Sequence, residues 1–265
     1  MNKTLILGSE GFIGRHFMDF LIQKGDEVVG IDIKNSDKQD LRFISLNLNK
    51  FDRVYFLAWD VGGAKYLYSE KAQYNQLSWN LRLMLNVFEQ MQKSNIKVIF
   101  SSTQLASQID TVYGVTKKLG EVWNSLIGGV NVRFWNVYGP LEEPSERTHV
   151  VSDFIYQSVY NETIKTLTDG SEKRQFIHID DVCRALDLAS NLENNFIYDI
   201  TSYEWISVRK VAEIISKISN KKIKFGNVVG STPITPNCCK IPGWIPKVKL
   251  EEGLLRMYTQ LFEKK

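Results

Sequence analysis

The sequence has few of the residues that build metal sites and disulfide frameworks. It contains three cysteines and three histidines among its 265 residues. Cys238 and Cys239 are adjacent and Cys183 is far away, so they form neither a CxxC pair nor a disulfide framework, and we expect a reducing cytoplasm. The histidines show no ligand spacing with cysteines or acids, so a metal site has no support.

Long hydrophobic runs and a charge excess of either sign are also missing. The apolar run before Gly8 consists only of Leu5, Ile6 and Leu7, too short for a signal peptide, and no apolar run reaches membrane-spanning length. Lys and Arg number 33 and Asp and Glu 30, and a net charge of +3 is too small to attract nucleic acid or a membrane strongly. We therefore expect a soluble intracellular protein that binds neither.

The stretch from Lys3 to Gly14, KTLILGSEGFIG, is the strongest local signal in the sequence. A short apolar run is followed by Gly8, Gly11 and Gly14, the spacing of a strand that turns into a nucleotide-binding helix. Gly8 allows the tight turn, Gly11 lets the backbone approach a pyrophosphate, and Gly14 lets the helix pack on the strand. Phosphates then bind the free N–H groups at the helix N-terminus.

A second strand, expected over 27–32, ends in an acid. Asp32 lies about 20 residues beyond the glycines, where the dinucleotide-binding fold places the carboxylate that binds the adenosine ribose. Because a carboxylate repels a 2′-phosphate, we expect NAD in preference to NADP, although Lys34 is close enough to soften that preference.

Alternating strands and helices predict an α/β fold, a doubly wound parallel sheet of the Rossmann type with a smaller C-terminal substrate-binding lobe. We expect a dinucleotide-binding domain over 1–140, to which 176–203 returns, and a lobe formed mainly by 141–265. Predicted strands cover 4–7, 27–32, 42–48, 53–58, 97–101, 131–136 and 196–200. Predicted helices cover 12–24, 70–94, 113–126, 150–160, 207–219 and 250–262, and a strand over 174–181 enters a further helix.

Tyr113 and Lys117 are four residues apart on a predicted helix, so they share one face. They follow a strand that ends in Ser101, Ser102 and Thr103. A tyrosine is a poor base at neutral pH, but an adjacent ammonium favours its phenolate. We therefore expect Lys117 to lower the pKa of Tyr113 and to hold the nicotinamide ribose, while Thr103 binds the reacting oxygen.

Motifs along nearly the whole chain resemble those of the extended short-chain dehydrogenases/reductases, in the nucleotide-sugar epimerase/dehydratase group. They are GSEGFIG (8–14) with Asp32, SST (101–103), YGVTK (113–117), RFWNVYGP (133–140), RQFIHIDDV (174–182) and GWIPKVKLEEGL (243–254). The resemblance implies a catalytic set of Thr103, Tyr113 and Lys117. It also implies that Asn136 contacts the substrate and that Arg174 clamps the nucleotide diphosphate.

The resemblance further implies a nucleotide-sugar substrate, and a homodimer formed through the helices over 70–94 and 113–126. The cofactor-binding residues that we expect are Gly8, Gly11, Phe12, Ile13, Gly14, Asp32, Ile33, Asn47, Leu48, Leu57, Ala58, Trp59, Ser101, Tyr113 and Lys117.

Departures from the family pattern narrow the reaction. Gln104 and Leu105 stand where 4,6-dehydratases carry an acid pair, and no cysteine lies near that position as in GDP-sugar 3,5-epimerases. The segment between Thr103 and Tyr113 is short, which predicts a more open sugar pocket. Hydride transfer at the sugar C4 remains, and a 4-epimerase is favoured. The alternatives are a keto-sugar reductase or sugar 4-dehydrogenase acting on a GDP- or dTDP-sugar, with VGG (61–63) resembling GDP-sugar enzymes, and more remotely a catalytically weak NAD-binding regulator.

Overall fold

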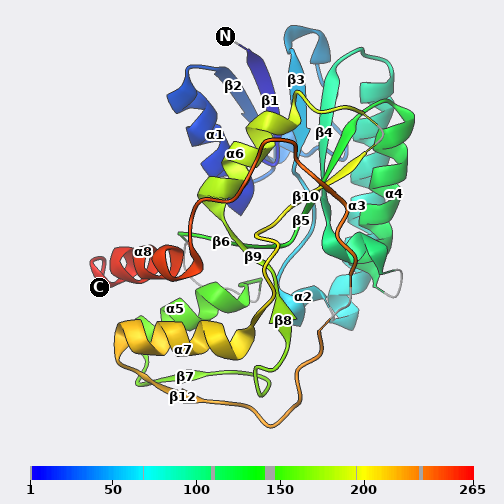
Figure 1. The fold of residues 1–265 in the computed structure, drawn as a ribbon. Coiled ribbons are helices and arrows are strands. Elements are labelled where there is room, and N and C mark those ends of the chain that lie inside the picture. Colours follow the sequence, from blue (N-terminus) through cyan, green and yellow to red (C-terminus); the bar gives the residue numbers. More distant parts are fainter. Residues whose placement is uncertain (1, 68, 109–110, 141–146, 195, 233–234) are drawn as a thin grey trace.

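A parallel β-sheet forms the centre of the computed structural model, which describes residues 2–67, 69–108, 111–140, 147–194, 196–232 and 235–265. Its strands are β1 (Lys3–Leu7), β2 (Glu27–Ile31), β3 (Arg53–Phe56), β4 (Lys97–Thr103), β5 (Val130–Phe134), β10 (Ile197–Ile200) and β13 (Cys239–Lys240). They lie in the order β13-β10-β5-β4-β3-β1-β2 (Figure 1). The helices are α1 (Phe12–Lys24), α2 (Ala64–Leu67), α3 (Glu70–Gln92), α4 (Val112–Leu126), α5 (Val150–Tyr160), α6 (Ile179–Ala189), α7 (Val208–Ser219) and α8 (Leu250–Phe262).

Two pairs of helices cover the two faces of the sheet. Because side chains alternate along a strand, Ile6 of β1 packs on one face and its neighbours Leu5 and Leu7 pack on the other. The face of Ile6 is covered by α1 and α6, and the opposite face by α3 and α4 (Figure 1). A parallel sheet buried on both faces is the predicted doubly wound fold, which is confirmed.

The chain reverses its direction across the sheet between β1 and β3. It enters at β1, moves to the edge at β2, and then returns past β1 to β3, β4 and β5. In such sheets, ligands bind outside the carboxyl ends of the strands at this point. Gly8 follows β1 and Leu57 follows β3, so both lie where the fold predicts a ligand.

The second half of the chain forms a smaller apolar core of its own. Phe154 of α5, Val211 of α7 and Leu254 of α8 pack in this core, apart from the sheet. Paired short strands accompany these helices: β6 (Asn136–Tyr138) with β9 (Phe176–His178), β7 (Thr163–Lys165) with β12 (Lys222–Lys224), and β8 (Lys173–Arg174) with β11 (Ile206–Ser207). The predicted boundary of the domains at residue 140 stays a prediction.

One predicted strand is wrong. Residues 42–48 contain turns, and a 3-10 helix (η2) follows at Leu48–Lys50. The amide of Asn86 on α3 binds the backbone instead, because its Nδ2 donates to the carbonyls of Leu41 (2.8 Å) and Ile44 (2.9 Å). Those partners are separated from Asn86 by 45 and 42 residues, so the local sequence pattern does not reveal them.

Candidate active site

The glycine turn after β1 has no room for side chains at Gly8 and Gly14. Gly8 has a φ of +93°, and a Cβ there would lie 2.5 Å from the backbone nitrogen of Ala58. A Cβ on Gly14 would lie 2.0 Å from the carbonyl oxygen of Gly8. Gly11 is the N-cap residue of α1, and since it has no side chain it leaves the first N–H groups of the helix uncapped. The turn therefore fits the predicted cofactor, and direct contact of these glycines with it stays a prediction.

Asp32 lies beside this turn and is 8% exposed. Its Oδ2 accepts the N–H of Glu10 at 3.0 Å, and its Oδ1 accepts the N–H of Lys34 at 2.9 Å. Each carboxylate oxygen has a second lone pair, so the group can still accept ribose hydroxyls. The ammonium of Lys34 donates to the carbonyl of Glu10 at 3.0 Å and has two further N–H donors, so Lys34 still softens the preference for NAD.

Of the other predicted cofactor residues, Leu57, Ala58 and Trp59 follow β3, Phe12 and Ile13 begin α1, and Asn47 and Leu48 precede β3. The N–H groups of Leu57 and Ala58 donate to the carbonyl of Leu7 at 2.9 and 2.7 Å, which continues the β1–β3 pairing into the ligand-facing loop. Phe12, Ile13 and Trp59 are partly exposed, Ile33 and Asn47 are exposed, and Leu48 is buried in the core. Leu48 thus has a packing role, and a cofactor role for it stays a prediction.

Lys117 is buried on α4 against the end of β4. Its Nζ donates to the carbonyl of Ser101 at 2.6 Å and lies 3.3 Å from the Ser101 hydroxyl. The ammonium also lies 4.0 Å from the centroid of the Trp59 ring, a cation–π contact. Burial lowers the pKa of Lys117 well below its ordinary value, and the charge of Glu121 opposes that shift.

Tyr113 and Thr103 meet at the same end of β4. Burial raises the pKa of Tyr113 to about 12, and a hydrogen bond with Thr103 opposes the rise. The Thr103 hydroxyl accepts the N–H of Leu105 at 3.3 Å, so its own proton is available to the phenol or to a ligand. The structure thus brings together the three residues of the predicted catalytic set, with Tyr113 and Lys117 on one helix.

The electrostatic effect expected of Lys117 on Tyr113 stays a prediction. The pKa of the phenol is shifted by burial and by Thr103, while the ammonium of Lys117 is held by Ser101. A local i, i+4 spacing shows that two side chains share a helix face, but it does not show which neighbour each one binds.

A buried ion pair behind α4 is not predicted from the sequence. Glu121 is 1% exposed, and its Oε1 accepts both Arg133 Nε at 2.5 Å and the Ser102 hydroxyl at 2.7 Å. The pair therefore fixes α4 against β4 and β5 next to Thr103. The sequence shows only that Glu121 shares a helix face with Tyr113 and Lys117, at intervals of four residues, and does not show that Arg133 is its partner.

Asn136 and Arg174, the predicted substrate residues, lie on neighbouring strand pairs. Asn136 pairs with Phe176, and its N–H donates to the carbonyl of Gln175 at 3.1 Å. The guanidinium of Arg174 donates to the carbonyls of Lys173 (2.8 Å) and Ser231 (3.2 Å). The fold therefore places the two residues near each other in the smaller lobe, and their contact with a nucleotide stays a prediction.

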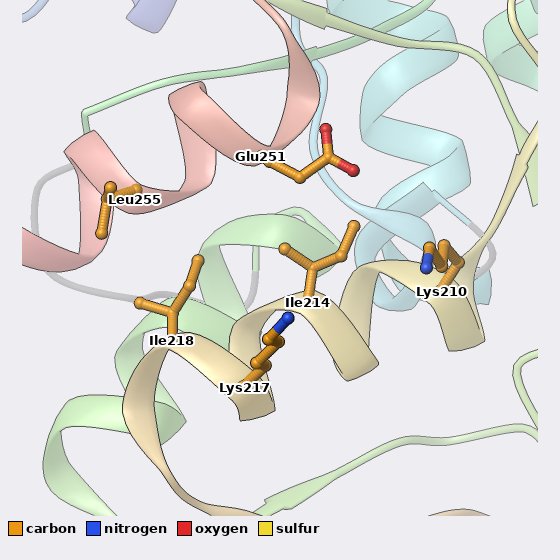
Figure 2. A pocket seen from close by; sticks show the side chains of 6 residues that line it. All are labelled: Lys210, Ile214, Lys217, Ile218, Glu251 and Leu255. Atoms are coloured by element: carbon orange, nitrogen blue, oxygen red, sulfur yellow. The ribbon is translucent and has the colours of Figure 1, made fainter.

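A pocket on the smaller lobe contains none of these residues. It lies between α7 and α8 and is lined by Lys210, Ile214, Lys217, Ile218, Glu251 and Leu255 (Figure 2). Within the described ranges, no cluster of three or more His, Cys, Asp or Glu side chains is arranged to hold a metal ion. None of the helices in the part of the chain that is described has the length and hydropathy needed to cross a bilayer.

Comparison with known proteins identifies the family. A model of the NAD dependent epimerase/dehydratase family matches residues 4–200. The UDP-glucuronate 4-epimerase of Thermodesulfobacterium geofontis is 24% identical over 97% of this chain and 95% of its own length.

Solved structures share the fold. The UDP-glucose 4-epimerase of Thermotoga maritima, solved with UDP-glucose, has a TM-score of 0.82 and 24% identity over 99% of both chains. The UDP-glucuronic acid 4-epimerase of Bacillus cereus, in complex with UDP-glucuronic acid and NAD, has a TM-score of 0.80 and 24% identity, covering 98% of this chain and 99% of its own. With the family match over most of the sequence, the chain belongs to the NAD dependent epimerase/dehydratase family, whose cofactor is NAD.

Proposed function

We propose that this protein is a nucleotide-sugar 4-epimerase that acts by hydride transfer at the sugar C4. The observation that carries the proposal is the meeting of Thr103, Tyr113 and Lys117 at the end of β4, next to the loop that leaves β3. The buried amide of Gln104 follows Thr103 and offers no acid for elimination, which argues against dehydration.

The chain's own residues supply the proton chemistry. Tyr113 takes the proton of the C4 hydroxyl and later returns it, while Thr103 donates a hydrogen bond to the same oxygen. NAD, when bound, supplies the hydride acceptor. Lys117 would hold the nicotinamide ribose, Asp32 the adenosine ribose, and Arg174 the diphosphate of the substrate. Planar guanidinium groups suit that last task because they can bind two phosphate oxygens at once.

UDP-sugars are the first substrates to test, because relatives of this chain are named for UDP-glucose and UDP-glucuronate. The resemblance of VGG (61–63) to GDP-sugar enzymes gives only weak support to a GDP-sugar once the structure is considered. A Cβ on Gly63 would lie 2.4 Å from the carbonyl oxygen of Thr148, so packing accounts for that glycine.

To test this proposal, the purified protein is incubated with UDP-, GDP- and dTDP-sugars, and both C4 epimers are followed by NMR. An epimerase interconverts the epimers without net formation of NADH. The alternative, a keto-sugar reductase or 4-dehydrogenase, oxidises or reduces one NAD(H) for each sugar converted. Release of stoichiometric NAD(H) on denaturation would favour the epimerase, since that reaction regenerates its cofactor within each cycle.

Asp32→Ala is expected to weaken NAD binding roughly 10- to 100-fold, because ribose hydroxyls lose a charged acceptor that contributes about 1.5–3 kcal/mol. Calorimetric titration of NAD and NADP measures the effect. Asp37→Ala is the matched control, since Asp37 is an exposed acid in the following loop. Tighter binding of NADP than of NAD by the wild type would show that the interpretation of Asp32 is wrong.

We also propose a homodimer formed through α3 and α4, which pack side by side on one face of the sheet (Figure 1). Leu77, Leu81 and Leu85 form an exposed stripe along α3, with exposed fractions of 40%, 39% and 52%. On α4, Val122 and Leu126 are 49% and 81% exposed. An apolar surface of this kind is typical of an interface between proteins.

Light scattering should therefore give the mass of two chains at micromolar concentration, and a two-fold symmetric pair is expected. The double substitution of Leu81 and Leu85 by Lys should yield a monomer, because it places charges on both sides of a symmetric contact. Leu255→Lys on α8 is the control, with a side chain of similar exposure. A monomeric wild type would contradict the proposal.

A further inference from the structure

The loop that leaves β3 carries an acid at the catalytic end of the sheet. Asp60 is one residue beyond Trp59, whose ring lies under the ammonium of Lys117. The backbone of Asp60 is held by Asn80 of α3, since Asn80 Oδ1 accepts its N–H at 2.8 Å and Asn80 Nδ2 donates to its carbonyl at 3.2 Å. Asn80 is fully buried. Asn80 therefore fixes the backbone of Asp60 to α3 of the sheet domain.

Arg147 reaches this acid from the other side. Its NH1 lies 2.8 Å from Asp60 Oδ1 and donates to the carbonyl of Val61 at 3.1 Å. Its NH2 donates to the Tyr66 hydroxyl at 2.8 Å, and its guanidinium lies 4.0 Å from the centroid of the Tyr66 ring. The Tyr66 hydroxyl in turn lies 2.7 Å from Asp60 Oδ2. One guanidinium thus joins Asp60 and Val61 of the loop to Tyr66 of α2.

The backbone contacts between the two segments are equally close. The N–H of Gly63 donates to the carbonyl of Arg147 at 2.9 Å. A Cβ on Gly62 would lie 2.9 Å from the Tyr66 ring and 3.0 Å from Arg147 Cγ. Gly62 and Gly63 therefore have no room for larger side chains, and the loop follows the course of the Arg147 segment closely.

Arg147 stands three residues before α5, a helix that packs with α7 and α8 in the core of the smaller lobe. Asp60, in contrast, belongs to the loop that carries the predicted cofactor residues Leu57, Ala58 and Trp59. The Asp60–Arg147–Tyr66 cluster is therefore a connection between the cofactor side and the substrate side of the site. Its members are far apart in the sequence, since Arg147 is 81 positions beyond Tyr66.

We propose that Arg147 is a positioning residue of the active site, which holds the loop over 57–63 against the start of the smaller lobe and so retains NAD. It acts on the cofactor through Asp60 and Trp59, not by touching the reacting atoms. The inference rests on the proposed function only for the identity of the substrate that the smaller lobe receives.

Release of NADH from the loaded protein, followed by stopped-flow fluorescence without any sugar nucleotide, tests the proposal. Arg147→Met should release NADH roughly tenfold faster than the wild type, the size expected when a charge-assisted contact is lost. Asp60→Asn should accelerate release similarly, and the double variant should release NADH more slowly than the product of the two single effects predicts, because both substitutions break the ion pair between Asp60 and Arg147. The melting temperature of each variant should stay close to that of the wild type.

Arg256→Met is the matched control. Arg256 is also about half exposed and ion-paired, with side-chain exposures of 51% for Arg256 and 47% for Arg147, but it lies on α8. NADH release should be unchanged in this variant. Unchanged release in Arg147→Met, or additive effects of the two cluster substitutions, would overturn the proposal. Because no sugar is present, failure of the wild type to convert nucleotide sugars would count against the proposed function alone.

Discussion

Tyr113→Phe is expected to lower kcat by about 10²- to 10⁴-fold while NAD remains bound. The substitution removes the phenol oxygen that exchanges a proton with the sugar and leaves the ring, the glycine turn and Asp32 in place. Calorimetry with NAD and steady-state kinetics with a nucleotide sugar measure the two properties separately. Tyr156→Phe on α5 is the control, because it removes the same oxygen from a tyrosine of the smaller lobe.

The pH dependence of the wild type gives a second measure of the same residue. The rate of sugar oxidation should rise with pH as the phenol loses its proton, since the phenolate is the base. This inflection should vanish in Tyr113→Phe. Burial raises the pKa of Tyr113 to about 12 in this structure. The pH of the inflection therefore shows how far bound cofactor and substrate lower that pKa. Near-full activity of Tyr113→Phe would mean that the base lies elsewhere.

Lys117→Met should lose both turnover and cofactor affinity, in contrast to Tyr113→Phe. The ammonium is the group that would hold the nicotinamide ribose, and a lost hydrogen bond to a charged group corresponds to roughly 10- to 100-fold weaker NAD binding. The fold should survive, because methionine is of similar length, places an apolar group beside the rings of Trp59 and Phe100 where the ammonium lies, and removes a buried charge.

Lys118→Met provides the control for that substitution. Lys118 follows Lys117 directly, is 43% exposed and pairs with Glu121 at 3.1 Å. Its loss should change neither kcat nor NAD affinity by more than about threefold, since the ammonium of Lys118 is exposed and Glu121 keeps Arg133 as its buried partner. If Lys117→Met binds NAD as tightly as the wild type, the ammonium does not hold the ribose.

Much of the fold could be predicted because local signals agree with it. The helix over 12–24 ends at Gly25, which adopts a left-handed φ of +95° and accounts for the predicted stop. Ser207 caps α7 by accepting the N–H of Lys210, again as a local pattern indicates. The strand expected over 42–48 fails for the opposite reason, because its backbone partners are side chains on a distant helix.

The same distinction applies to the site. Gly8 and Asp32 belong to one motif and Tyr113 to another, and each motif has a characteristic spacing. The sequence therefore predicts each of these residues. The contacts of Arg147 with Asp60 and of Glu121 with Arg133 join separate segments, and each segment looks like an ordinary loop, helix or strand on its own. Sequence spacing also cannot show that the ammonium of Lys117 binds Ser101, because that choice depends on packing around the whole side chain.

The central claim, epimerisation by hydride transfer at C4, is tested most directly with UDP-glucose deuterated at C4, with the deuterated UDP-glucuronate as a second substrate. NMR of the products follows both the configuration at C4 and the label. The account predicts a mixture of C4 epimers in which the product keeps its deuterium at C4, with no net NADH. Accumulation of deuterated NADH with a keto-sugar, or replacement of the label by solvent hydrogen at C4, would contradict it.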